Sequence, residues 1–301
     1  MLKVNHYMPI PEEVVSSFYL EEYLSQLRIE GLTHNTIGYY IGMLHLFIRH
    51  SSFSSYLDFG NFVKLKMAYY NLSGKNMGNN TIYKHYKCIK KYSDFLKESE
   101  LIDKVHINQI PKIKTTNPLP KAMTEEDILK MREYILRPGV HQTKFIQMRN
   151  YILVETFLHT GLRRAEIINL KRNGVYETHI IVEQGKGQKD RIIYIPQKFS
   201  RQLQEYIEIQ DKNSIYVFCD LQGRQLGVSA ISCLFRRIKE ALKINLSPHL
   251  LRHTYASICV KRGINLYTLQ QQMGHTSLKT TSIYLYLNSK ETFEEMQKLR
   301  I

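Results

Sequence analysis

The sequence has few acidic side chains for its size and no long apolar run, and both shortages narrow the classes of function. It has 27 Asp and Glu against 42 Lys and Arg, which leaves a formal charge of +15 over 301 residues. Such an excess of positive charge indicates a polyanionic partner. No stretch approaches the roughly 18 apolar residues that a membrane-spanning helix requires. Nucleic acid is therefore a better candidate partner than a membrane.

Cysteine is also scarce, and its spacing excludes two kinds of site. The four cysteines form no C-x-x-C pair, the spacing that structural zinc sites and redox motifs show. We therefore expect buried thiols, with no metal and no disulfide. Acidic residues and prolines interrupt any apolar run in the first 30 residues, so no signal peptide is expected. We place the chain in the cytoplasm, associated with the nucleoid.

Three of the eight prolines gather near one place, at Pro111, Pro118 and Pro120. Proline holds itself and its predecessor in extended shapes, and lysines surround these three. Residues 111–121 are therefore expected to be a linker. It separates a domain of residues 1–110 from a domain of residues 122–301.

The two domains differ in their apolar patterns. In the first, helical spacing predicts a helix through 14–27 that ends at Gly31, then helices that begin at Thr33 and Thr81. In the second, helices surround two β-like stretches, 175–182 and 191–195, joined by a turn. The fold class expected is mainly α, with a small antiparallel β-sheet in the second domain.

A stripe of three lysines follows Thr81 at helical spacing: Lys84, Lys87 and Lys91. One face of a helix with three ammonium groups suits the backbone of DNA. A solvated helix face is the alternative, since charge runs are usually solvated. Either way, such contacts specify no base sequence.

Cationic and imidazole side chains are spread over the second half of the chain. Two arginines, a lysine and two histidines suit a phosphodiester and the extra charge of a phosphoryl-transfer transition state. Glu166 stands three residues after the first arginine and could hold its guanidinium, with a surface ion pair as the alternative. His253 is a weaker candidate because it points away from Arg252. The candidates are Arg163, Lys186, His249, Arg252 and His275.

Lys186 lies between two glycines in the turn that joins the β-like stretches. The P-loop pattern G-x-x-x-x-G-K-[ST] is absent, so ATP use is not expected. A lysine on such a turn could protonate a leaving 5′ oxygen as general acid. Metal-dependent nucleases need clustered carboxylates, and no cluster appears beyond Glu166. We therefore expect metal-free chemistry without a cofactor.

A tyrosine would supply the nucleophile, but residue type cannot single it out among 21. Tyr284 stands close to the last histidine candidate. Tyr286 and Tyr267 are its local competitors.

Five short motifs, in this order, resemble the tyrosine recombinases, also called phage integrases, and in particular their short Xer-like members. Two departures are Met273, where leucine is usual before Gly-His, and Tyr286, where many members carry histidine. Neither removes a catalytic group. The motifs lie at residues 160–167, 185–191, 247–254, 273–277 and 280–284.

The resemblance implies a helical SAM-like core-binding domain and an α-rich catalytic domain that clamp DNA between them. The nine-residue step from His275 to Tyr284 matches the family and favours Tyr284 over Tyr286. Because one ester replaces another, the reaction needs no ATP. The implied roles are a phosphate site made by Arg163, Arg252, His275 and His249, a general acid at Lys186, a 3′-phosphotyrosine at Tyr284 and a supporting acid at Glu166.

Family members act as four protomers on two duplexes, so the partners expected are a double-stranded recombination site and three further copies of the chain. The function expected is site-specific recombination in integration, excision, resolution or inversion. Two alternatives stay open. One is relaxation of DNA by a type IB topoisomerase, and the other is DNA binding without catalysis.

Overall fold

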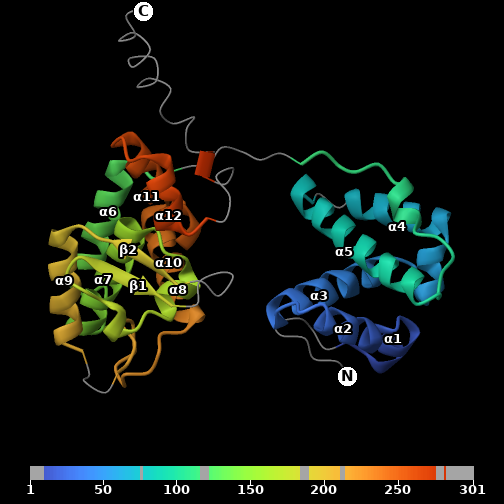
Figure 1. Ribbon diagram of the computed structural model, residues 1–301, viewed down its shortest axis with the longest axis horizontal. Coiled ribbons are helices and arrows are strands. Elements are labelled where there is room, and N and C mark those ends of the chain that lie inside the picture. Colours follow the sequence, from blue (N-terminus) through green and yellow to red (C-terminus); the bar gives the residue numbers. More distant parts are fainter. Residues whose placement is uncertain are drawn as a thin grey trace, which may run out of the picture. The chain divides into compact units, whose positions relative to one another are not determined.

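The chain divides into two compact units, residues 1–118 and 119–301, and each is described by itself (Figure 1). The computed structural model describes residues 10–74, 77–115, 122–183, 190–210, 214–275 and 281–282.

The first unit is helical throughout its described residues. Its longest helices, α3 and α5, pack against each other, and α2 and α4 pack against α3. The helices are α1 (Glu12–Ser17), α2 (Leu20–Ile29), α3 (His34–His50), α4 (Phe62–Ser73) and α5 (Asn79–Glu98), with the 3-10 turns η1 (Tyr56–Gly60) and η2 (His106–Gln109).

The single helix predicted through 14–27 is wrong, because the chain turns at Phe18 and Tyr19. Tyr19 adopts a left-handed backbone (φ 47°), which ends α1 and starts α2. The turn places the Phe18 carbonyl where the buried hydroxyl of Tyr92 donates to it, at 2.5 Å. A long-range hydrogen bond in the core thus overrides the local helical pattern. The start of α3 after Thr33 agrees with the prediction, and α5 begins two residues before Thr81.

The second unit packs helices around α7, which contacts α6, α9 and α11. The hydroxyl of Thr124 accepts the backbone N–H of Asp127 at 3.1 Å, so it caps α6. The elements are α6 (Glu125–Leu136), α7 (Lys144–Thr160), α8 (Arg164–Ile168), η3 (Arg172–Gly174), β1 (His179–Val182), β2 (Arg191–Tyr194), α9 (Gln197–Glu208), α10 (Val228–Leu242), α11 (Pro248–Lys261) and α12 (Leu266–Met273).

The strands β1 and β2 form a two-stranded antiparallel sheet in the second unit (Figure 1). Ile180 pairs with Ile193, and both side chains point into the core of helices. The strand predicted from residue 175 begins only at 179. Residues before it form a turn instead, in which the Tyr176 N–H donates to the His179 carbonyl at 2.9 Å. The mainly α fold with a small antiparallel sheet is confirmed.

Within the described ranges, no helix combines the length and apolar character needed to cross a membrane. The helices instead bury their apolar faces in a main core in each unit and in a smaller cluster between α11 and α12.

Candidate active site

The turn after α7 sets the position of Arg163. Gly161 ends the helix in the left-handed conformation (φ 60°), and its N–H donates to the Phe157 carbonyl at 3.0 Å. The hydroxyl of Thr160 then accepts the N–H of Leu162 at 3.2 Å. These bonds turn the chain sharply, so Arg163 stands with an extended backbone immediately before α8.

Glu166, on the first turn of α8, is surrounded by donors. Its Oε1 accepts from the Nη1 of Arg163 at 2.8 Å, and its Oε2 accepts the backbone N–H of the same residue at 2.8 Å. Arg191 donates through Nη1 and Nη2 to the same two oxygens, at 2.9 and 2.8 Å. The surface ion pair considered from the sequence is wrong, because Glu166 is only 9% exposed.

The pKa of Glu166 reflects this surrounding. Burial would raise it, but the hydrogen bonds and charge of Arg191, followed by the bonds from Arg163, lower the pKa to about 2. The carboxylate is therefore ionised at neutral pH. As a fixed acceptor, it holds two guanidinium groups in one place.

Arg252 reaches the same place from α11. Ser247 caps that helix by accepting the N–H of Leu250 at 3.1 Å, and α11 packs against α7. The guanidinium donates through Nη1 to the Gly161 carbonyl at 2.5 Å and through Nη2 to the Met273 carbonyl at 2.7 Å. Arg252 is 6% exposed. It thus connects the end of α7 to the end of α12.

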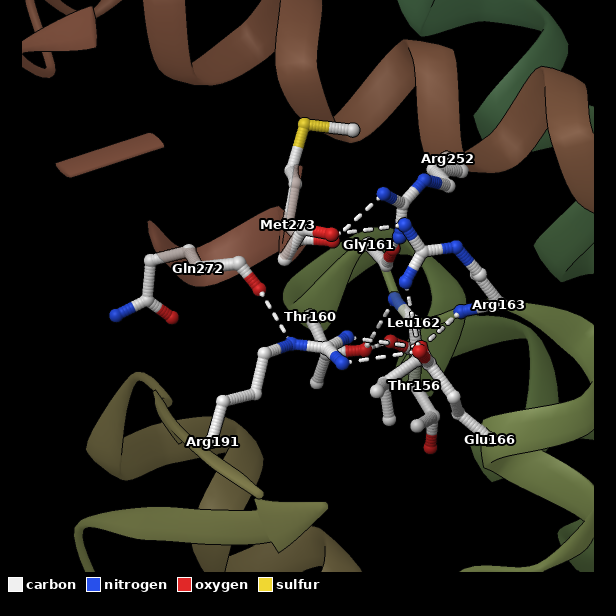
Figure 2. Close-up of polar contacts among 11 residues, drawn as sticks. Thr156, Thr160, Gly161, Leu162, Arg163, Glu166, Arg191, Arg252, Gln272 and Met273 are labelled. Carbon is white, nitrogen blue, oxygen red and sulfur yellow. Dashed lines mark hydrogen bonds and ion pairs between the residues drawn. The ribbon is translucent and has the colours of Figure 1, made fainter. Parts of the chain in front are cut away.

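The two arginines meet at the end of α12. Arg163 donates through Nη2 to the carbonyl of Gly274 at 2.9 Å, and Arg252 binds the carbonyl of the preceding residue, Met273. Figure 2 shows both guanidinium groups close to that turn, with Glu166 below them and Arg191 approaching from β2. Arg163 and Arg252 are more than 80 positions apart in sequence, but their bonds to adjacent carbonyls hold them side by side.

His275 follows this turn and is the third member of the cluster. Its N–H donates to the Gln270 carbonyl at 3.2 Å, and its Nδ1 lies 2.9 Å from the hydroxyl of Thr281. Burial, and then the charges of Arg252, Arg163 and Arg191, lower its pKa to about 4. The imidazole is therefore neutral at pH 7, and it offers one N–H as a donor.

The chain is similar to known proteins over most of its length. A model of the phage integrase family matches residues 121–291, which include all five motifs. The chain belongs to the phage integrase family. It is 29% identical over 296 residues to the tyrosine recombinase XerA of Pyrococcus furiosus, covering 96% of each chain. It is 30% identical over 218 residues to the tyrosine recombinase XerC of Chlamydia trachomatis, covering 70% of this chain and 68% of the relative.

Solved structures share the fold of this tyrosine recombinase. The XerH site-specific recombinase bound to palindromic difH substrate matches with a TM-score of 0.71 at 20% identity, covering 93% of this chain and 83% of that chain. A lambda integrase dimer bound to a COC′ core site matches with a TM-score of 0.72 at 18% identity, covering 88% and 93%. The resemblance to Xer-like members inferred from the motifs is confirmed.

His249 lies on the first turn of α11 in the recombinase and is exposed. It stands one turn before Arg252, and its charge contributes to lowering the pKa of His253, after the larger effect of burial. His253 is half-buried, in keeping with the weaker role given to it. His249 is thus at the rim of the cluster, where a ligand could reach it.

Two candidates, Lys186 and Tyr284, lie outside the described residues. Thr281, three positions before Tyr284, is buried and lies beside His275. Tyr267, a competitor for the nucleophile, is 62% exposed at the start of α12. It is seven residues before Gly274, or roughly 10 Å along the helix axis. Tyr267 is therefore at the wrong end of α12 for the cluster.

The lysine stripe lies on α5 of the first unit. Lys84 and Lys87 are exposed, and the latter ammonium is 4.9 Å from the centre of the Tyr83 ring. Lys91 instead pairs with Glu30, at 2.6 Å between Nζ and Oε2. The sequence spacing predicts that the three lysines share one helix face, but it does not predict that Glu30 pairs with Lys91.

Arg191 is the residue that sequence reasoning missed. It is the last residue of the motif at residues 185–191. The sequence alone gives it no role, because its partner Glu166 is 25 positions away. Its Nε donates to the Gln272 carbonyl at 3.3 Å. The cluster has a net charge of +2, because it holds three guanidinium groups and one carboxylate, and this charge suits an anion. These groups belong to Arg163, Arg191, Arg252 and Glu166. In the described parts of the chain, no three His, Cys, Asp or Glu side chains are grouped to hold a metal ion.

Proposed function

We propose that the chain is a site-specific DNA recombinase that cleaves and rejoins DNA through a 3′-phosphotyrosine formed by Tyr284. The observation that carries this proposal is the convergence of Arg163, Arg252 and His275 on the turn at Gly274. Backbone carbonyls hold both guanidinium groups, the buried carboxylate of Glu166 also holds Arg163, and the imidazole of His275 lies beside the Thr281 hydroxyl, so these donors are preorganised for a phosphodiester. Membership of the phage integrase family supports the same chemistry.

The proposed reaction exchanges one phosphate ester for another. The phenolic oxygen of Tyr284 gives its proton to solvent water and bonds to phosphorus, while the bond from phosphorus to the 5′ oxygen breaks. Lys186 supplies the proton that this leaving oxygen takes up. Arg163 and Arg252 offset the charge that grows on the non-bridging oxygens. One phosphate ester replaces another of similar energy, so the scheme needs no ATP, and the two guanidinium groups fill the charge-stabilising role that a metal ion has in other phosphoryl transfers.

A suicide duplex, nicked so that the cleaved fragment diffuses away, tests the proposal. We expect wild-type protein to form a covalent adduct in EDTA and Tyr284→Phe to form none while binding the duplex equally well. Tyr267→Phe is the matched control, because Tyr267 is exposed and remote from the turn at Gly274. An undiminished adduct with Tyr284→Phe would reject the assignment.

A plasmid with two target sites separates recombination from the other functions that the sequence allows. Defined recombinant products support recombination, relaxation without regard to sequence supports a topoisomerase, and a gel shift alone supports DNA binding without catalysis. We include in the proposal a homotetramer on two duplexes and action in the cytoplasm on nucleoid DNA. Sedimentation of the protein with its duplex tests the tetramer.

A further inference from the structure

Arg191 uses most of its hydrogen-bond donors on the protein itself. Three of its five N–H donors are taken by the protein: two by the carboxylate of Glu166 and one by the Gln272 carbonyl. Its side chain is 13% exposed, against 25% for that of Arg163. Arg191 is therefore directed at the protein framework.

The position of Arg191 also closes the turn that carries His275. A Cβ atom built on Gly274 would lie 2.9 Å from the Cζ and 2.9 Å from the Nε of Arg191. The guanidinium thus packs directly on the backbone of Gly274, whose carbonyl receives Arg163. One side chain from β2 contacts both the carboxylate and the turn that align Arg163.

We propose that Arg191 is a positioning residue for DNA cleavage, which aligns Arg163 and the His275 turn by gripping Glu166 and Gly274. The inference rests on the proposed function and deepens it. It assigns the base of the β-hairpin a role in shaping the phosphate site. Arg191 itself need not touch the DNA.

The charge balance at Glu166 explains why this role requires arginine. Burial works against ionisation of Glu166, and Arg191 provides the largest opposing contribution. Its planar fork matches both carboxylate oxygens, which an ammonium group cannot do. Without the fork, the pKa of Glu166 rises, and at mildly acidic pH the carboxyl becomes protonated and its grip on Arg163 weakens.

The test compares Arg191→Gln with a matched control, Arg132→Gln. Arg132 also forms a two-pronged ion pair, with Glu155, at 2.7 Å for both bonds, and among the described residues none of its hydrogen bonds or ion pairs reaches the cluster at Gly274. At saturating suicide duplex, we expect Arg191→Gln to cleave about 10²-fold more slowly, since small misplacements cost about that much. Arg132→Gln should cleave at the wild-type rate.

Binding measurements separate alignment from direct contact. Loss of one phosphate contact would reduce the slope of log affinity against log salt by about 0.9. We expect Arg191→Gln to keep the wild-type slope. A reduced slope would overturn the inference and make Arg191 a DNA ligand.

Two further variants keep the test decisive if Arg191→Gln folds poorly. Arg191→Lys preserves the charge and should still cleave slowly, so full recovery would overturn the requirement for the fork. Arg191→Gln should lose cleavage between pH 7 and 5, and the double variant with Glu166→Gln should not, because no carboxyl remains to titrate. Purely additive effects of the two substitutions would contradict action through Glu166.

An absent wild-type adduct would reject the proposed function, whereas full cleavage by Arg191→Gln would reject this inference alone.

Discussion

Gly161→Ala is the substitution whose effect follows most directly from the geometry. Gly161 has φ near +60°, and a Cβ atom there would lie 2.4 Å from the Cδ1 of Tyr255, a buried ring. The left-handed backbone costs about 1–2 kcal/mol for a residue with a Cβ. Overpacking against this buried ring adds about 1–3 kcal/mol. We expect the free energy of unfolding to fall by about 2–5 kcal/mol in total.

A second glycine isolates the packing contribution. Gly263 has φ near +74°, and a Cβ atom there would meet nothing within 4 Å. Gly263→Ala should therefore lose only the backbone part, about 1–2 kcal/mol. Urea unfolding of both full-length variants, followed by circular dichroism, measures the difference. Equal losses would refute the steric argument.

The same pair of variants tests whether the turn matters for chemistry. The Gly161 carbonyl accepts Arg252, so displacement of this turn shifts a guanidinium of the proposed phosphate site. We expect Gly161→Ala to slow single-turnover cleavage by about 10²-fold at saturating duplex. Gly263→Ala should cleave as wild type does, and a similar slowing of both would show that stability alone governs the rate.

Three other outcomes follow from the cluster and from the first unit. A bound phosphodiester should raise the pKa of His275 from about 4, so binding takes up a proton and DNA affinity should increase as the pH falls from 7 to 5. In binding titrations at constant salt, His275→Gln should make the affinity less dependent on pH. An unchanged pH dependence would contradict the placement of His275 beside the phosphate. Arg163→Met should reduce the salt slope of binding by about 0.9, and an unaltered slope would argue against phosphate contact. Asp58 caps η1 and binds Lys64, and although burial would raise its pKa, these bonds lower it. Asp58→Asn should therefore lower the free energy of urea unfolding by about 1 kcal/mol at neutral pH, with a smaller difference as the pH falls through the lowered pKa and the wild-type carboxyl takes up its proton; no loss at neutral pH would contradict the cap.

Local patterns predicted most of the helices, because caps and apolar periodicity act within a few residues. Thr124 and Thr33 are examples where a side-chain oxygen marks the helix start. One error fell where a distant contact decides, because the hydroxyl of Tyr92 stabilises the turn at Phe18. Another fell where a local turn, from Tyr176 to His179, shortens β1.

The candidate site divides in the same way. Residue types and spacing were enough to single out Arg163, Arg252 and His275, because phosphoryl transfer needs such donors and the motifs occur in a recognisable order. The i, i+3 spacing also suggested the contact between Arg163 and Glu166. The burial of that contact could not be read from the sequence, since it depends on α12 and β2 packing over it.

The sequence by itself determined the chemical class of this protein, because charge, motif order and helix caps are properties of neighbouring residues. Only the tertiary structure decided that Arg191 grips Glu166 and that Met273 and Gly274 present their carbonyls to two guanidinium groups. These contacts join residues 21 to 111 positions apart. They arise because the packing of α7, α11, α12 and β2 brings distant backbone turns within hydrogen-bond distance, and no local pattern encodes that proximity.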